Sequence, residues 1–346
     1  MRFPLERLDA FVVEVFTAFD VLPEHAEITA RRLVEADLRG RTGHGVIRVP
    51  QYVTRIEAGG INLRPEIQLL RETPVSALVD GDNGLGQVVM TLATETAIEK
   101  ATQSGMAWVG TVHSNHAGAA GIYTGLALEN DLIGMYMAVA SANVMPPWGG
   151  SERLLGTNPI AIAIPAGSET PLQIDIATTV ASHGTIKVVA QAGENMPEGW
   201  VIDTEGNPIT DPAKADEGFL MPIGGYKGAG LNMAIGLLAG VLNDAAFGSE
   251  VIDHRSVHDQ PANTGQAILV MRPDLFRDLD DFKDDMDSHL RAMREAGPPG
   301  AVHIPGDGAV RLEAEQRSQG VEISPTLLAQ LRALANRFEL DDHLDD

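Results

Sequence analysis

The chain of 346 residues contains no cysteine, and this absence removes several kinds of chemistry at once. A disulfide framework, a thiolate zinc site and a cysteine nucleophile are all excluded. A reducing compartment fits such a composition, so we expect a cytoplasmic protein. The length is sufficient for two domains whose combined core needs neither a disulfide nor a metal for stability.

Positive charge is also scarce. The chain has 25 Lys and Arg against 48 Asp and Glu, which gives a formal net charge of −23. A protein of this charge repels phosphate backbones, so nucleic acid is not an expected partner. If such a protein binds an anion, it must concentrate positive charge locally. Single arginines and lysines beside glycine-rich loops are therefore of particular interest.

Long hydrophobic runs are missing as well. The longest, Leu231–Leu242, is interrupted by Asn232 and is too short to cross a bilayer. Residues Met1–Glu14 alternate charged and apolar side chains, unlike a signal peptide. There is no Gly-x-Ser-x-Gly motif and no obvious serine nucleophile. We expect a soluble protein with no membrane partner.

The apolar pattern divides the chain into helical ends and a mixed middle. Helical spacing predicts a helix from Leu5 to near Asp20, one that opens at Pro23 and one that begins at Pro325 after Ser324. The expected strands are Val75–Val79, Met106–Val112, Leu132–Ala140, Ile160–Ile164, Leu172–Ile176 and Gln266–Met271. The helices expected between or after them are Val88–Ser104, Ala117–Glu129, Gly228–Leu242 and Pro273–Ala296.

This order predicts an α/β domain over residues 75–300 and a helical domain made of residues 1–74 and 301–346. The break at Gly297-Pro-Pro-Gly300 supports the second boundary. The acidic end, Asp341–Asp346, is predicted to fray.

The stretch Arg39–Tyr52 is the first candidate for chemistry. It places His44 between Gly43 and Gly45, with Arg48 four residues further on. Histidine titrates near neutral pH, and the arginine fork fits a carboxylate. The stretch suggests a site for a small anionic substrate, although an ordinary loop would read the same way.

A second histidine cluster, His113-Ser-Asn-His116-Ala-Gly118, directly follows an expected strand. Strand ends that lead into a helix often carry chemistry in α/β proteins. Taken with Arg39–Tyr52, the cluster favours a proton-transfer histidine. A metal site is the alternative, but the loop lacks the helical spacing and acidic partner of a metallohydrolase. His25, His254, His258 and His289 are interpreted as surface or structural residues.

Two glycine-rich segments could bind phosphate. Gly84-Leu-Gly86 begins a dinucleotide fingerprint, but Val89 occupies its third small position, so a structural strand-to-helix turn is favoured. Gly224–Gly230, with Lys227, is either an anion cradle at a helix N-terminus or a hinge for close packing. The pattern alone leaves both interpretations of the second segment open.

As a set, these motifs resemble the malate/L-lactate dehydrogenase-like family of NAD(P)-dependent oxidoreductases, which is distinct from the Rossmann-type enzymes. The matching segments span almost the whole chain: Arg39-Gly, His44-Gly-Val-x-Arg48, Ser114-Asn-His116-x-Gly118, Pro147-Trp-Gly-Gly150, Gly156-Thr-Asn-Pro159, Asp175-x-Ala-Thr178, Gly225-Tyr-Lys-Gly228 and Pro305-Gly-Asp307. Segments around Arg55, Asn62 and Gln87 look most similar to ureidoglycolate dehydrogenase.

The resemblance implies an α/β (α+β) fold whose cofactor-binding domain has a mixed, largely antiparallel sheet, plus a helical domain, in a homodimer or higher homo-oligomer. It implies that His116 exchanges the proton and that His44, Arg48 and Thr157 contact the substrate. The cofactor-binding residues that it implies are Ser141, Asp175, Ile176, Ala177, Lys227, Gly306 and Asp307. No metal is implied.

The implied activity is hydride transfer between NAD(P) and a small 2-hydroxy or 2-oxo acid, with ureidoglycolate, malate, lactate and sulfolactate as candidates. The family usually has Ser where this chain has Gly43. It usually has Gly-Lys where this chain has Gly184-Thr185, which favours NAD with NADP as the alternative. A cyclic imino acid reductase and a catalytically silent carboxylate-binding protein are the competing hypotheses.

Overall fold

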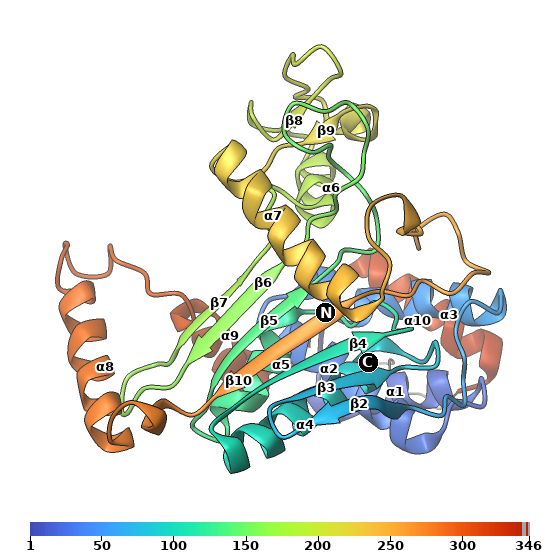
Figure 1. Cartoon of the computed structure of the whole chain (residues 1–346). Helices are drawn as coiled ribbons and strands as arrows, with labels where there is room; N and C mark the ends of the chain where they lie inside the picture. Colours follow the sequence, from blue (N-terminus) through green and yellow to red (C-terminus); the bar gives the residue numbers. More distant parts are fainter. Residues whose placement is uncertain (341–343, 345–346) are drawn as a thin grey trace.

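A computed structural model gives the structure of residues 1–340 and 344. Its centre is a seven-stranded sheet in the order β2–β3–β4–β10–β5–β6–β7 (Figure 1). Of its six strand pairs, only β3–β4 is parallel. The predicted mixed, largely antiparallel sheet is therefore confirmed. The strands are β2 Gln68–Thr73, β3 Ser76–Asp80, β4 Met106–Val112, β5 Ile133–Ala138, β6 Ile160–Ile164, β7 Leu172–Ile176 and β10 Gln266–Met271.

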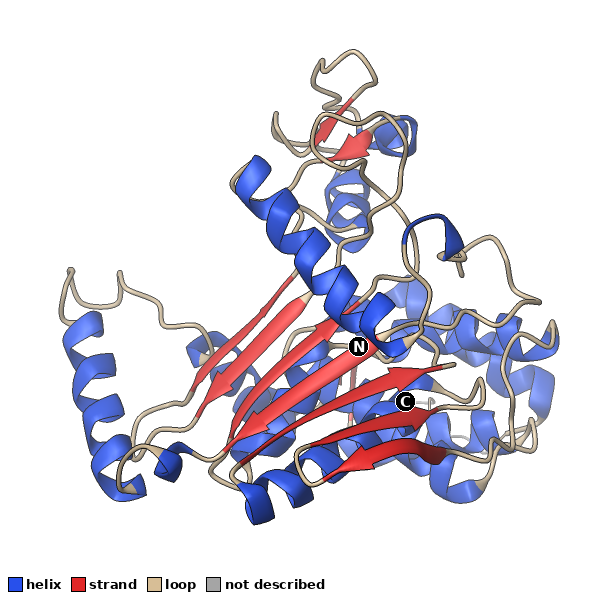
Figure 2. Ribbon diagram, in the orientation of Figure 1, coloured by secondary structure: helices blue, strands red, loops and turns tan. Residues whose placement is uncertain are grey.

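Helices cover both faces of this sheet. Successive side chains of a strand point to opposite faces, so each face presents apolar side chains that need a cover. On β5, Tyr136 and Ala138 pack with the alanine-rich helices α4 (Gly86–Ser104) and α5 (Ala120–Leu128). Met135 and Met137 point to the opposite face, where α7 (Tyr226–Ala239) lies (Figures 1 and 2). The alanines on α4 let this helix approach the strands closely.

Both ends of the chain share one apolar core, which contains Phe11, Leu33, Tyr52, Val321 and Leu331. The helices around it are α1 Leu5–Thr17, α2 Pro23–Leu38, α3 Val49–Glu57, α9 Asp307–Gln319 and α10 Pro325–Phe338. A two-stranded sheet of β1 (Arg2–Phe3) and β11 (Val321–Glu322) closes the arrangement. A helical domain built from both ends would rest on this core. Its boundaries at residues 74 and 301 stay a prediction.

A small lobe extends beyond the end of the sheet (Figure 2). It contains α6 (His183–Ala192), a 3₁₀ turn at Pro212–Glu217, and a hairpin of β8 (Val201–Ile202) and β9 (Phe219–Leu220). Its own apolar core consists of Val144, Ala181, Ile186, Met196, Val201 and Leu220.

The sequence pattern missed the helices α3, α6 and α9 and the edge strand β2, and it extended α8 (Leu279–Arg294). Helix α6 is only ten residues long, and its apolar face consists of little more than Ile186 and Val189. Helix α9 is almost entirely polar, with only Gln316 buried, so it carries no apolar stripe. The predicted helix at Pro273–Ala296 is instead a 3₁₀ turn at Pro273–Leu275 followed by α8, which Asp278 caps. Further 3₁₀ turns lie at Val241–Asn243 and Gly248–Glu250. The predicted fraying of Asp341–Asp346 falls largely outside the described residues.

None of the helices in the described part of the chain combines the length and the hydropathy that a membrane span requires.

Helix α8 is attached to the β6–β7 turn through one carboxylate. Asp287 accepts hydrogen bonds from the backbone N–H groups of Gly167, Ser168 and Glu169 at 2.9, 2.7 and 3.1 Å, and from the Ser168 hydroxyl at 2.6 Å. Burial alone would raise the pKa of this carboxyl. The hydrogen bonds, that of the Ser168 hydroxyl foremost, outweigh burial and hold the pKa well below its usual range.

We expect Asp287→Asn to destabilise the protein at pH 7 by about 1–3 kcal/mol, because an amide cannot accept all four hydrogen bonds. A depressed folded-state pKa contributes stability above the unfolded value, about 3.9, and loses it as the pH falls toward the folded value. Urea unfolding at pH 7 and pH 3 should therefore show a larger difference from wild type at pH 7. Asp284→Asn, on the exposed side of the same helix, is the control.

Candidate active site

The stretch around His44 and Arg48 is folded rather than loose. It forms two 3₁₀ turns, η1 (Thr42–His44) and η2 (Val46–Arg48), and continues directly into α3. Asp37, at the end of α2, accepts the N–H of Val46 at 2.8 Å. A Cβ at Gly45 would lie 2.2 Å from this carboxylate, so only glycine fits there. Burial raises the pKa of Asp37 to about 7, although the Val46 N–H lowers it.

Arg48 is the positive charge that the turns present. Its Nε donates to the carbonyl of Gly43 at 2.7 Å, and its Nη1 donates to Oε1 of Gln51 at 3.0 Å. These two acceptors are neutral, and none of the ion pairs of the described residues includes Arg48. A half-buried guanidinium without a protein carboxylate is suited to bind the carboxylate of a ligand. At Gly43, an added Cβ would meet no atom within 4 Å.

His116 is positioned by the end of the central strands. Gln266, the first residue of β10, bonds to Thr111 at 2.7 Å and donates its amide to the carbonyl of Asn115 at 2.8 Å. On the ring of His116, Nδ1 lies 2.7 Å from the hydroxyl of Tyr52 and 3.4 Å from the N–H of Gly118. Both hydrogen bonds of the ring reach Nδ1, which leaves Nε2 for a substrate.

Two further imidazoles flank this ring. His44 stacks on His116 with 5.7 Å between ring centroids, and His254 meets it edge-on at 5.3 Å. Burial, and then the charge of Arg48, lowers the pKa of His44 and of His254 to about 3. Burial, Arg48 and the two neighbouring histidines also hold the pKa of His116 well below its usual value. At neutral pH the three rings are uncharged, and His116 can accept a proton.

Of the two interpretations of His254, surface or structural, the surface one is wrong. His254 is 6% exposed, and its loop is held against α3 by Arg55, which donates to the carbonyls of Val257 and Gln260 at 2.8 and 2.9 Å. No local signal marks this histidine, because Asp253 and Arg255 beside it are typical of an exposed turn. Its role depends on a loop more than a hundred residues away from His116.

The structure separates His113 from His116. His113 has a positive φ of 50° and pairs with Asp80 at 3.0 Å, away from the imidazole cluster. Within the described residues no group of three His, Asp or Glu side chains is arranged to hold a metal ion. The His-x-x-His spacing is thus a consequence of the strand end.

The glycines at 84 and 86 belong to a structural turn, as the sequence favours. The amide of Asn115 donates to the carbonyls of Asn83 and Gly84 at 3.0 and 2.9 Å. A Cβ at Gly86 would lie 2.2 Å from the carbonyl of Asn115. Helix α4 therefore begins directly against the backbone of the His116 loop.

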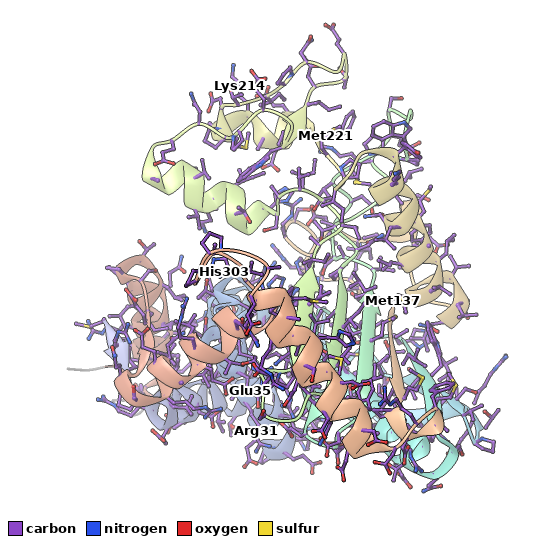
Figure 3. The ribbon with its side chains drawn as sticks, turned by 90° about the vertical axis from the view of Figure 1, so that its left-hand side faces the viewer. Arg31, Glu35, Met137, Lys214, Met221 and His303 are labelled. Atoms are coloured by element: carbon purple, nitrogen blue, oxygen red, sulfur yellow. The ribbon has the colours of Figure 1, made fainter. Side chains whose placement is uncertain are left out.

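A cavity of about 280 Å³ lies beside the η1 turn, at the N-terminal ends of α5 and α9. Arg39, Arg41, Gly121, Ile122, Gln173, Ile174, Asp175, Ile304, Pro305, Gly306, Gly308 and Ala309 line it. Asp175 accepts the N–H of Gly121 at 3.0 Å and lies 3.5 Å from Nε of Arg41. In Figure 3, His303 lies on the loop that joins α8 to α9, below the small lobe.

The other residues predicted to bind the cofactor do not all lie at this cavity. Asp175 and Gly306 line the cavity, whereas Asp307 pairs with Arg294 at 2.8 Å. Ile176 is exposed at the end of β7, with Ala177 next to it. Ser141 lies close to the imidazoles, because its carbonyl accepts the N–H of His254 at 3.2 Å.

Two predicted residues remain apart from both groups. Lys227 is exposed in the first turn of α7 and is not among the residues that line the cavity. Thr157 presents its carbonyl to the N–H and the hydroxyl of Thr178, at 2.9 and 3.0 Å, so its backbone has a structural role. Their assignments to cofactor and substrate stay predictions.

The fold is shared with dehydrogenases of known structure. An L-sulfolactate dehydrogenase of Methanocaldococcus jannaschii is 38% identical over 332 residues, 95% of each chain. The solved structure of sulfolactate dehydrogenase from this organism superposes with a TM-score of 0.91 at 37% identity, covering 99% of this chain and 98% of that one.

Other relatives differ in the names of their cofactors and substrates. Ureidoglycolate dehydrogenase (NAD(+)) of Escherichia coli K12 is 34% identical over 93% of each chain. A (2R)-3-sulfolactate dehydrogenase (NADP(+)) of Chromohalobacter salexigens is 31% identical over 96% of this chain and 97% of its own. A Δ1-piperideine-2-carboxylate reductase of Pseudomonas syringae has a TM-score of 0.88 at 27% identity, covering 97% of this chain and all of that one.

The match to a family extends over almost the whole chain. Residues 3–332 match the malate/L-lactate dehydrogenase family, and they include the η1 and η2 turns, the His116 loop and the cavity. The chain belongs to the malate/L-lactate dehydrogenase family.

Proposed function

We propose that the protein is an NAD(P)-dependent dehydrogenase that acts on the CH–OH group of a small 2-hydroxy acid. The observation that carries this proposal is the pairing of an uncompensated guanidinium, Arg48, with a neutral imidazole, His116, whose Nε2 is free. The first can bind the carboxylate of a substrate, and the second can exchange the proton of its hydroxyl. The family and its named relatives have this reaction in common.

In the oxidation direction, Nε2 of His116 takes the proton of the substrate hydroxyl while the C2–H bond breaks. Arg48 holds the carboxylate and thereby fixes where C2 lies relative to the ring. A bound nicotinamide would supply the hydride acceptor for C2 and, in the reverse direction, the hydride donor. The neighbouring His44 and His254 limit access of water to the His116 ring and keep it in a narrow range of orientations.

The cavity beside Arg41 fits part of such a cofactor, because it combines two helix N-termini, two arginines and a buried carboxylate. Asp175 and Gly306 would contact the cofactor there, and Ser141 lies where it can approach the reacting end. We propose NAD as the preferred cofactor. Lys187, the cation nearest in sequence to the usual Gly-Lys position, is exposed on α6.

We also propose a homodimer. Helix α7 and the turn after it leave a row of large apolar side chains exposed: Leu231, Leu237, Leu238, Val241 and Leu242, between 40% and 62%. A monomer rarely leaves such a row in water. Light scattering should therefore give about twice the chain mass. A cytoplasmic location remains a prediction without a structural test.

A cyclic imino acid reductase is the second candidate, because the piperideine-2-carboxylate reductase has the same fold. Its substrate also carries a carboxylate next to the reduced carbon. Oxidation of NADH and NADPH should be followed with 2-oxo acids and with pyrroline-2-carboxylate. Faster reduction of the imine would replace the first proposal with the second.

Replacing His116 with Ala should lower turnover by at least about 10², because a positioned proton donor and acceptor typically contributes 10²–10⁴. Cofactor affinity, measured by quenching of protein fluorescence, should change little. His113→Ala is the matched control, since His113 is exposed and pairs with Asp80. Near-normal turnover of the His116 variant would contradict the assignment.

Replacing Arg48 with Met should raise KM for 2-hydroxy acids by about 10² or more, because the carboxylate loses a charged bidentate partner. The corresponding methyl esters should be affected far less. Arg64→Met, at an exposed position, controls for the general loss of one positive charge. Equal losses with acids and esters would mean that Arg48 does not bind the carboxylate.

The substrate itself is best identified with a panel of sulfolactate, malate, lactate and ureidoglycolate, each with NAD and with NADP. We expect turnover with at least one of these acids, recorded at the absorbance of the reduced nicotinamide. If none of them reacts with either cofactor, but the protein still binds carboxylates, a silent binding protein becomes the better description.

A further inference from the structure

A buried chain of hydrogen bonds leads away from the catalytic imidazole. Gln87, in the first turn of α4, is fully buried and donates its Nε2 to the hydroxyl of Tyr52 at 2.8 Å. Tyr52, which is 3% exposed, lies 2.7 Å from Nδ1 of His116. Three residues from α3, α4 and the His116 loop are thus linked in series.

The donors and acceptors in this series determine where the proton of His116 lies. A tyrosine hydroxyl carries one proton, and here its oxygen already accepts from the amide of Gln87. The hydroxyl therefore donates to Nδ1 of His116, toward which the N–H of Gly118 also points at 3.4 Å. An Nδ1 that accepts leaves the proton of the neutral ring on Nε2.

One buried atom in the series has no partner. The carbonyl oxygen of Gln87, Oε1, receives no hydrogen bond from any described residue, although it is inaccessible to water. A buried carbonyl without a partner destabilises the folded protein. Such an atom calls for a reason, and a second state of the site would provide one.

That second state arises whenever Nδ1 carries a proton. The ring then donates from Nδ1 to the Tyr52 oxygen, and the Tyr52 proton turns to another acceptor. The backbone carbonyl of His116 lies 3.4 Å from this hydroxyl, which is long for an O–H···O hydrogen bond. A half-turn of the Gln87 amide brings Oε1, the unpartnered atom, to the place of Nε2 at 2.8 Å from the hydroxyl, and so offers a closer acceptor. Glutamine can do this because it carries a donor and an acceptor on the same planar group.

Since the chemistry requires Nε2 to receive a proton, a ring with its only proton on Nε2 must first change its tautomer. Nε2 then releases its proton to water and Nδ1 takes one from water in exchange, so the ring stays neutral, and Tyr52 and Gln87 only reorient their own protons. We propose that Gln87 and Tyr52 form a reversible hydrogen-bond relay that selects the tautomer of His116. In the free protein the relay donates toward Nδ1, and the proton of the ring is on Nε2. In the catalytic state Gln87 accepts from Tyr52, Nδ1–H donates to Tyr52, and Nε2 exchanges a proton with the substrate hydroxyl. This inference rests on the proposed dehydrogenase function for its role in turnover.

The surroundings make such a relay necessary. The groups that face His116 are His44 from η1, Arg48 from η2, Tyr52 from α3 and His254 from the loop after η5 (Gly248–Glu250). Arg55 acts on Tyr52 from the same helix. None of these groups is a carboxylate, so no negative charge stabilises the protonated ring. Gln87 and Tyr52 are positioning residues that supply this stabilisation without adding charge.

The first test is independent of activity. Long-range ¹H–¹⁵N NMR of the full chain reports the tautomer and the pKa of each histidine, and the His116→Ala variant assigns the signal. We expect the Nε2–H tautomer in the free wild type. In Gln87→Glu the ionised carboxylate can only accept, so we expect the Nδ1–H form and a pKa of His116 raised by about one unit or more.

The second test uses turnover. Gln87→Met and Tyr52→Phe should each lower the rate of hydroxy-acid oxidation by about tenfold to a hundredfold, with cofactor affinity retained. Because oxidation needs a deprotonated Nε2, its rate rises with pH through the pKa of His116. This limb of the profile should move to higher pH in Gln87→Glu. Thr94→Val, which removes another buried hydrogen bond within α4, should leave the profile unchanged.

The outcomes separate the relay from the activity. An Nδ1–H tautomer in the free wild type, or a tautomer and pH profile that ignore substitutions at Gln87, would overturn the relay even in an active dehydrogenase. If the wild type oxidises none of the acids, the proposed function fails, while the NMR result still decides the relay. Should Gln87→Glu not fold, Gln87→Met and Tyr52→Phe provide the same decision.

Discussion

The organisation of the site depends on one positive charge that no protein carboxylate neutralises. In a chain with a net charge of −23, Arg48 bonds only to neutral acceptors within the described structure. Its field and the burial of the site keep three adjacent imidazoles uncharged. A carboxylate ligand would complete the ion pair and reduce this field at His116. Binding of a carboxylate at Arg48 and the proton affinity of His116, the proposed acid–base group, are therefore coupled electrostatically.

Hydrogen bonds from two different parts of the fold keep Arg48 and the ring of His116 in place. Asp37 fixes the turns that carry Arg48, and Gln266 fixes the loop that carries His116. Asn115 joins that loop to the turn before α4, and Gly86 allows the helix to begin against it. Buried polar side chains serve here as connectors, since each satisfies a backbone group of another segment. The rigidity of the site follows from these long-range bonds.

Close packing of the sheet against α4 also contributes to the site. Alanines on α4 and on β4 let helix and strand approach closely, and the larger side chains of β5 alternate between the two faces. The first turn of α4 thereby comes within hydrogen-bond distance of Tyr52. A bulkier interface would keep Gln87 away from the acid–base group. The core and the catalytic relay are in this sense one structure.

Much of this protein could be predicted from local sequence. The positions of most strands and helices and the mixed sheet implied by the family motifs follow from short segments whose neighbours in sequence carry the signal. Such segments also mark His44, Arg48 and His116 as candidates, and the structure brings these three residues together. The helix α9 could not be predicted because it has no apolar stripe, and α6 could not because it is too short for a clear helical period. His254 and Gln87 could not be identified from the sequence for a different reason. Their roles arise from contacts with residues far away in the chain, which only tertiary packing brings within hydrogen-bonding or stacking distance. The sequence by itself determined which chemical groups are available, and the fold decided which of them share a proton, because that depends on distance and burial.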